Sequence, residues 1–271
     1  MTMVDDGSRE LASGDVRYRL LGPVAATASS GVLPLGGPKQ RTVLAALLLR
    51  AGHVVPENRL VAAVWGEAPP STVRGQLQTY VWNLRKLLGA RTIVRQPPGY
   101  MINIGVGQLD VDVFTRAVQE SGRSLAAGRP DSAVVTLRSA LALWDGAALG
   151  GATKALIQYE GPALDEQFLA AYEQLFDAEL SLGRHIQIIA ELRRLVEEYP
   201  YRERLTGQLM RALHRSGRTV DALSLYAAVR ARLALEFDIA PSPHLQELYG
   251  RLRGRDSLTS AVASPVSAGV A

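Results

Sequence analysis

The spacing of apolar residues divides the chain into two parts. The N-terminal part shows both the two-residue period of strands and the 3.6-residue period of helices, whereas the C-terminal part shows only the helical period. Residues 16–20 are apolar at every second position, which predicts a half-buried strand, and a second short strand is predicted at 32–35. Two helices are predicted next, at 38–51 and 56–65, each opened by a proline and closed by a glycine.

The stretch 73–88 is predicted to form a third helix, with Ser71 or Thr72 as its cap. Steps of three and four residues predict a core-facing stripe of Val73, Leu77, Val81, Leu84 and Leu88. The remaining surface has no acidic residue and carries Arg74, Gly75, Gln78, Thr79, Trp82, Asn83, Arg85 and Lys86. A DNA major groove accepts cations, amides and apolar groups, so these residues are candidates for binding DNA. Taken alone, the stretch fits a basic amphipathic scaffold helix equally well.

Two more strands are predicted at 92–95 and 100–104, around a turn with two prolines. Strand, strand, three helices and a hairpin is the order of a winged helix-turn-helix, which we predict for residues 15–107. The third helix would then enter the major groove. The hairpin residues predicted to lie along the neighbouring DNA backbone are Arg95, Gly99 and Tyr100.

From residue 108 onward the pattern predicts helices, and three segments share a motif. In each, a glycine that ends a helix is followed by an arginine, by a small or aliphatic residue five positions after the glycine and by a large residue nine positions after it. The glycines are Gly128, Gly183 and Gly217. The last two are separated by 34 residues, the length of a tetratricopeptide unit. We therefore predict an all-helical, tetratricopeptide-like bundle over 108–255, with an insertion over 144–162.

The two ends of the chain lack this periodicity. Residues 1–14 are polar and acidic without an apolar core, so we predict disorder there rather than a signal peptide. A last helix is predicted from 244 to about 253, and 256–271, which is poor in charge, is predicted to be disordered. The predicted fold class is mainly α with a small β component.

Positive charge is concentrated in the front part. Residues 15–105 contain eleven Lys and Arg and three Asp and Glu, although the whole chain has a formal net charge of +4. Clustered positive charge favours polyanions. The chain has no cysteine, which excludes disulfides and thiolate metal sites, and its longest apolar run, 43–49, is too short to cross a bilayer. We interpret it as a soluble cytoplasmic protein.

The sequence contains no convincing catalytic motif. Residues 35–42 superficially resemble a phosphate-binding loop but lack the G-x-x-x-x-G-K-[ST] spacing. The four histidines are far apart, none with a partner at metal-ligand spacing, and there is neither a cysteine nucleophile nor a G-x-S-x-G elbow. We therefore predict neither enzymatic activity nor a cofactor or metal site.

The three tryptophans are not equivalent. Trp65 and Trp144 each end an apolar run and are predicted to pack in a core. Trp82 points away from Leu77 and Leu84 on the helical wheel, so it either contacts DNA or packs under the wing or against the second domain.

In combination and order, these motifs resemble the SARP family, the Streptomyces antibiotic regulatory proteins. The segments that carry the resemblance are Leu21-Gly22-Pro23, Pro38-Lys39-Gln40-Arg41, Leu60 to Gly66, Tyr80 to Leu88, Gly99-Tyr100, Leu141 to Gly146, Arg202 to Leu205 and Leu209 to Arg218. The resemblance implies an OmpR-type winged helix followed by a bacterial transcriptional activation domain of tetratricopeptide-like hairpins. The chain resembles the short, stand-alone members.

The resemblance also implies an activator that binds direct repeats of double-stranded promoter DNA near the −35 element, with two copies side by side. It would recruit RNA polymerase holoenzyme, including the sigma factor, and switch on a secondary-metabolite (antibiotic) gene cluster. By the same resemblance, the connector that faces polymerase consists of Gly66, Glu67, Ala68, Pro69 and Pro70. Trp82 and Asn83 stand where OmpR-type helices often carry arginine, so no base preference follows.

Two alternatives stay open at this point. The chain could be a tetratricopeptide-like interaction scaffold with a degenerate winged helix, which would bind DNA without sequence preference. It could also be a ligand-responsive repressor on the same fold, with a small molecule in the helical half. Gel shifts on the promoters of neighbouring genes and in vitro transcription distinguish these functions.

Overall fold

The chain is described by a computed structural model, which covers residues 16–262. The predicted disorder of residues 1–14 therefore lies outside the described residues. The described chain forms two compact units: one comprises residues 16–121 and 136–171, and the other comprises 122–135 and the chain from 172 onward.

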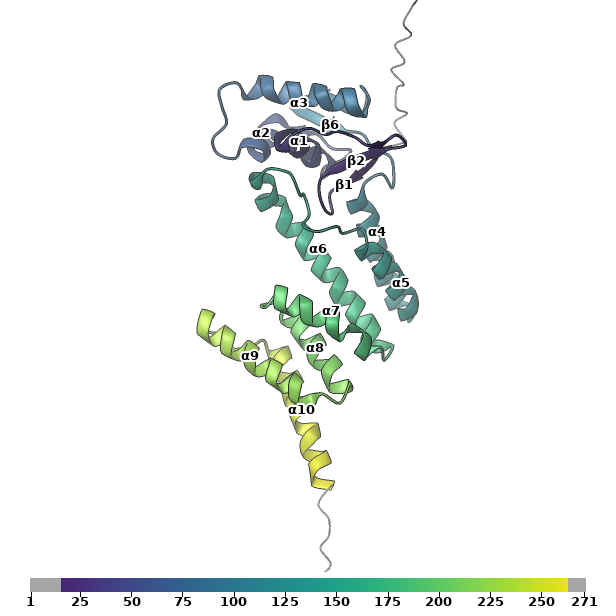
Figure 1. The fold of residues 1–271 in the computed structure, drawn as a ribbon, viewed down its shortest axis with the longest axis vertical. Helices are drawn as coiled ribbons and strands as arrows, with labels where there is room; N and C mark the ends of the chain where they lie inside the picture. The colour runs from purple at the N-terminus through teal and green to yellow at the C-terminus, as the bar shows by residue number, and fades with distance from the viewer. Residues whose placement is uncertain (1–15, 263–271) are drawn as a thin grey trace, which may run out of the picture. The chain divides into compact units, whose positions relative to one another are not determined.

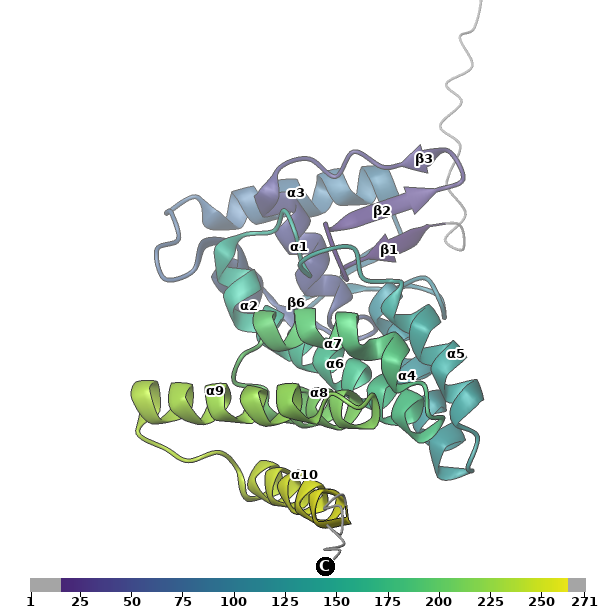
Figure 2. The same cartoon turned by 60° about the horizontal axis from the view of Figure 1, so that its bottom comes forward.

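The first unit starts with a three-stranded antiparallel sheet in the order β1-β2-β3 (Figure 2). Its strands are β1 (Arg17–Arg19), β2 (Ala25–Ala28) and β3 (Gly31–Val32). The strand predicted at 16–20 is confirmed. The strand predicted at 32–35 is wrong in position, because β3 ends at Val32. Strand β2 was not predicted, because its Ala-Ala-Thr-Ala sequence has a weak preference for extended structure.

Three helices follow, as Figure 1 shows: α1 (Pro38–Leu48), α2 (Glu57–Trp65) and α3 (Val73–Leu88). They pack through fully buried side chains such as Leu44, Leu60 and Leu84. Helix α1 ends at Leu48, before the predicted end at 51. The predicted start of the second helix at Pro56 is also wrong, because this residue pairs with Gly99 in a short strand.

The second sheet has the order β4-β6-β5 and forms the wing. Its strands are β4 (Val55–Pro56), β5 (Ile93–Gln96) and β6 (Gly99–Ile102). The predicted hairpin of β5 and β6 is confirmed. Strand β4 has two residues, too few for any periodicity in the sequence, and only its pairing with β6 defines it.

Helix α4 (Asp110–Ala126) is anchored to the first sheet by its first residue. The Asp110 carboxylate accepts hydrogen bonds from the backbone N–H groups of Leu20 and Leu21, each at 2.9 Å. Burial raises the pKa of Asp110 more than its backbone N–H partners lower it. The anchor is therefore a largely desolvated carboxyl group that joins the start of α4 to the segment after β1.

The segment between α5 (Pro130–Leu141) and α6 (Lys154–Ser181) packs within the first unit. Leu149 N–H donates to Leu20 at 2.9 Å, and Thr153 N–H donates to the Thr42 hydroxyl at 2.8 Å. Within the predicted insertion over 144–162, residues 154–162 form the start of α6. Pro162 lies inside α6, where the helix tolerates the loss of one N–H donor.

Trp144 is half-buried, in partial agreement with the core role predicted for it. Its ring centroid lies 5.5 Å from that of Phe114 and 4.7 Å from that of Phe168. These three aromatic rings come from α4, from the segment after α5 and from α6. Edge-on and tilted contacts of this kind stabilise a core beyond simple area burial.

The three predicted glycine-arginine motifs are confirmed as the turns of helical hairpins. Gly128, Gly183 and Gly217 have positive φ values of 68°, 75° and 75°. In each motif the N–H of the following arginine donates at 2.9 Å to the carbonyl five residues earlier: Arg129 to Ser124, Arg184 to Glu179 and Arg218 to Leu213. This is the bond of a Schellman helix end, and it explains why glycine recurs at this position.

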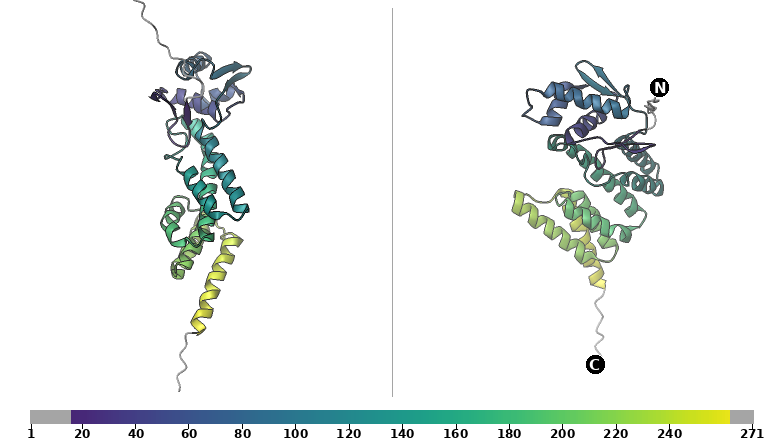
Figure 3. Two further views of the ribbon diagram at one scale, coloured as in Figure 1. Left: turned by 90° about the vertical axis from the view of Figure 1, so that its right-hand side faces the viewer. Right: turned by 45° about the horizontal axis from the view of Figure 1, so that its top comes forward.

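The second unit contains the complete helices α7 (His185–Glu198), α8 (Glu203–Arg215), α9 (Thr219–Phe237) and α10 (Pro243–Val262). Helix α8 packs against both α7 and α9, as Figure 3 shows, and α10 packs against α8 and α9. The prediction that the last helix ends near 253 is wrong, because α10 continues to Val262. The rest of the predicted disordered tail, 263–271, lies outside the described residues.

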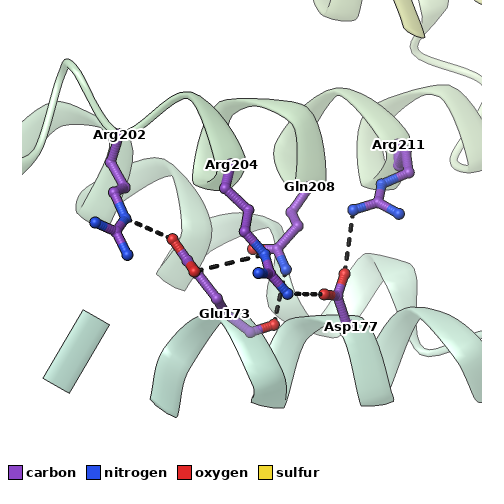
Figure 4. Close-up of polar contacts among 6 residues, drawn as sticks. All are labelled: Glu173, Asp177, Arg202, Arg204, Gln208 and Arg211. Atoms are coloured by element: carbon purple, nitrogen blue, oxygen red, sulfur yellow. Dashed lines mark hydrogen bonds and ion pairs between the residues drawn. The ribbon is translucent and has the colours of Figure 1, made fainter. Parts of the chain in front are cut away.

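An acid-arginine network connects α6 to α8 in this unit (Figure 4). The Glu173 side chain is 4% exposed, and its carboxylate lies 2.6 Å from Nε of Arg202 and 3.5 Å from Nε of Arg204. The more exposed Asp177 pairs with Arg204 at 2.9 Å and with Arg211 at 3.1 Å. The charge of Glu173 is therefore less solvated than that of Asp177, so the stability of the fold depends more on the arginines that pair with Glu173.

Replacing Glu173 with alanine is expected to destabilise the chain by about 3 kcal/mol, because two arginines lose a buried counter-charge. The Asp177→Asn variant is the matched control and should cost under about 1 kcal/mol, because that carboxylate is partly solvated. Urea unfolding followed by circular dichroism measures both. Equal losses would contradict the dominant role of Glu173.

Candidate nucleic-acid interface

Helix α3 has a buried stripe and an exposed face, as its sequence predicts. Leu77, Val81, Leu84 and Leu88 are at most 1% exposed. The opposite face is solvent-exposed and contains Arg74, Gly75, Gln78, Thr79, Trp82 and Lys86. These six residues, called the α3 face below, present two cations, an amide, a hydroxyl, an indole and a glycine on one rigid element.

Trp82 is the largest apolar group on the α3 face. Its side chain is 62% exposed, so it does not pack under the wing. The Lys86 ammonium lies 5.7 Å from the centre of the indole ring, within the range of a cation–π contact. The pair therefore presents a flat aromatic ring with a positive charge beside it. This arrangement suits the DNA major groove, which has phosphates along both edges.

Asn83 and Arg85 are less available than the sequence predicts. The Asn83 side-chain amide donates to Gln40 Oε1 at 3.1 Å, and Arg85 Nε donates to the Ile93 carbonyl at 2.7 Å. Both side chains are half-buried, so they hold α3 against α1 and the wing. Asn83 therefore supports the packing of α3, and its contact with the groove stays a prediction. Gln40 was missed because it lies 43 positions before its partner.

The wing residues are divided between surface and core. Arg95 is half-exposed and contacts Glu57 at 2.5 Å and the Tyr100 hydroxyl at 2.9 Å. Hydrogen bonds to Tyr100 and to Glu57 raise the pKa of Arg95. Tyr100 is 3% exposed and Gly99 is buried, so neither offers a side chain to DNA, contrary to expectation. Both residues pair with β4, Tyr100 with Val55 and Gly99 with Pro56.

The connector between α2 and α3 is exposed from Glu67 to Pro70, and Gly66 is half-buried. Gly66 has a φ of 65°, which suits glycine at this chain reversal. Thr72 occupies the N-cap position but makes no capping bond from its side chain. Its hydroxyl accepts a hydrogen bond from the Gln76 side chain at 2.9 Å, so the predicted cap position is confirmed but the side-chain capping bond is not formed.

Trp65 borders the start of this connector. Its ring is stacked with that of Tyr80 at a centroid distance of 6.2 Å, and the Lys39 ammonium lies 5.3 Å from the ring centre. The side chain is half-buried, in partial agreement with the core role predicted from the sequence. The stacking joins the end of α2 to the middle of α3.

The described residues contain neither a cluster of metal-ligating side chains nor a helix that could span a membrane. Over residues 16–262, no group of three or more His, Cys, Asp or Glu side chains is placed to hold a metal ion. Within the same residues, no helix combines the length and apolar character needed to cross a membrane.

Comparison with known families assigns both parts of the sequence. Residues 34–102 match the family described as "Transcriptional regulatory protein, C terminal". Residues 109–253 match the family described as "Bacterial transcriptional activator domain". The first range includes α3 and the wing, and the second includes the three glycine-arginine turns.

Individual relatives combine both parts. The chain is 38% identical over 92% of its length to Regulatory protein AfsR of Streptomyces griseus, of which it spans only 26%. It is 35% identical over 86% of its length to Regulatory protein DnrI of Streptomyces peucetius and spans 90% of that protein.

A solved structure agrees with these relatives. The structure of Mycobacterium tuberculosis EmbR, in complex with a low-affinity phosphopeptide, is 34% identical, with a TM-score of 0.83. The match covers 92% of this chain and 69% of that one. Sequence families, relatives and fold agree, and the chain belongs to the SARP family of transcription regulators.

Proposed function

We propose that the protein is a sequence-specific transcriptional activator that binds direct repeats near the −35 element of a promoter. In this proposal it recruits RNA polymerase holoenzyme through the sigma factor and works in the cytoplasm on a secondary-metabolite gene cluster. The observation that carries the proposal is the α3 face, which is exposed, contains no acidic residue and lies on a helix with a buried opposite side.

The α3 face has the chemistry required for both parts of DNA recognition. Arg74 and Lys86 are exposed cations that suit phosphates or guanine, and Gln78 is an exposed amide that suits adenine. Trp82 and Thr79 add apolar and hydroxyl contacts. The rigid scaffold beneath them holds their spacing, because four leucine and valine side chains are locked in the core.

Footprinting of the whole chain on the upstream regions of adjacent genes tests the proposal. We expect two protected half-sites in the same orientation, with centres about one or two helical turns of about 10.5 bp apart, because two copies bind one face of the duplex. DNA binding that is abolished by salt and shows no preferred DNA sequence would instead support the interaction-scaffold alternative.

The connector provides a separate prediction about polymerase. Changing Glu67 and Pro70 together to alanine is expected to leave promoter affinity within about twofold, because both side chains are exposed and outside the α3 face. Transcription by purified holoenzyme should fall several-fold, because the surface proposed to meet polymerase is altered. Gel shifts and in vitro transcription measure the two effects.

The matched control for the connector is Val106→Ala, a change at a loop residue that is 91% exposed. It should alter neither DNA affinity nor transcription. A parallel loss of DNA binding in the connector variant would mean that the connector only supports α3. A wild-type protein that lowers the transcript level would favour the repressor alternative.

A further inference from the structure

The first unit contains a groove of about 830 Å³, lined by residues of α2, β4 and the start of α6. Its wall on α2 is formed by Arg59, Ala62, Ala63 and Gly66. These positions follow the i, i+3, i+4, i+7 pattern of one helical face. Three of them are alanine or glycine, and the shortness of these side chains leaves the space open.

The opposite wall comes from the first turns of α6. Ala155, Leu156 and Tyr159 line the groove there, and Val55 and Ala46 close its base. At one end the walls meet: a Cβ atom placed on Gly66 would lie 3.8 Å from Cβ of Ala155. The lining is therefore mainly apolar, and it is built from elements that belong to the same compact unit.

The polar groups of the groove are unequally paired. Arg50 lies 3.8 Å from Glu160, so each partly neutralises the other. The Arg59 guanidinium is exposed and makes no hydrogen bond or ion pair with any side chain of the described residues. The remaining carboxylate, Glu67, is exposed in the connector. Arg59 is therefore a cation free to bind an anion at the rim.

We propose that this groove binds a small amphipathic anion, with a flat apolar body between α2 and α6 and a carboxylate or sulfonate at Arg59. The volume lies within the range of about 300–1,000 Å³ that is usual for small-molecule sites. Such sites combine a mainly apolar lining with a few polar groups that orient the ligand, which is the arrangement here.

A ligand in the groove contacts both the connector and α6. Gly66 and Glu67 line the groove and begin the connector, and Ala155 and Tyr159 belong to α6. A bound anion therefore links the connector to α6. The site itself does not depend on the proposed function, because its binding is measured without DNA or polymerase.

The test uses 8-anilino-1-naphthalenesulfonate as the probe and the full chain as the protein. We expect a saturable rise in dye fluorescence with one site per chain. Ala62→Phe fills the groove from an exposed helical position and should weaken that binding by about tenfold or more. Arg59→Gln should weaken it by about two- to fivefold, because one exposed charge contact is lost.

Matched controls lie on other helices. Ala227→Phe on α9 and Arg193→Gln on α7 make the same changes at exposed positions and should leave the one-site binding unchanged. Melting curves by circular dichroism confirm that each variant is folded. Unchanged dye binding in Ala62→Phe, or an equal loss in Ala227→Phe, overturns the site. Equal affinity for the uncharged N-phenyl-1-naphthylamine overturns the preference for an anion.

Discussion

Replacing Gly99 with alanine is expected to destabilise the winged helix by about 3 kcal/mol or more. A Cβ atom at this position would lie 1.8 Å from the Val55 carbonyl oxygen and 2.8 Å from Cα of Pro56. Both contacts are with backbone atoms, which no side-chain rotation relieves. Strand β4 would have to separate from β6, and the bonds that join the wing to the start of α2 would be lost.

Thermal unfolding followed by circular dichroism measures this effect. The matched control is Gly75→Ala, because Gly75 is exposed in the first turn of α3 with no atom within 4 Å of an added Cβ. That change should stabilise the fold by about 0.5–1 kcal/mol, since alanine favours a helix over glycine. A Gly99→Ala protein with the same melting temperature as the wild type would contradict the β4–β6 register.

Removing both cations of the α3 face, as Arg74→Ala with Lys86→Ala, is expected to weaken binding to the footprinted promoter by roughly 10- to 100-fold. The slope of log affinity against log salt concentration should decrease by about two, because two fewer counterions are released. Lys86 also lies beside the Trp82 indole, so its loss alters the largest apolar group on this face.

The matched control removes two exposed arginines of the second unit, as Arg193→Ala with Arg230→Ala. The net charge falls by the same amount, but promoter affinity and salt slope should stay close to wild type. Fluorescence anisotropy at several salt concentrations measures both double variants. If the two behave alike, general charge drives binding and α3 is not the reading helix.

Elements with a local signature could be predicted from the sequence. The stripe of α3 follows a period of 3.6 residues: Leu77, Val81, Leu84 and Leu88 are buried, and Val73, the fifth predicted position, is half-buried. The three glycine-arginine turns were also predictable, because a left-handed helix end selects glycine through its own backbone geometry. Neither feature requires knowledge of distant residues.

The members of the proposed DNA-facing surface could be predicted only in part. Arg74, Gln78 and Lys86 are exposed as the helical wheel predicts, whereas Asn83 is held by Gln40. In the wing, the two-residue periodicity shows which strands exist but not which side meets β4. The burial of Tyr100 therefore follows from pairing with a strand that the sequence pattern does not reveal.

The order of helices and hairpins, the basic front part and the acid-free face of α3 are evident from the sequence, because each depends on neighbouring residues and their periodicity. Three other features become visible only in the folded chain: residues 142–153 pack on the first sheet and α1, Asn83 and Arg85 support α3, and a groove opens beside Arg59. These features join residues far apart in the chain, whose contacts follow no period along the sequence.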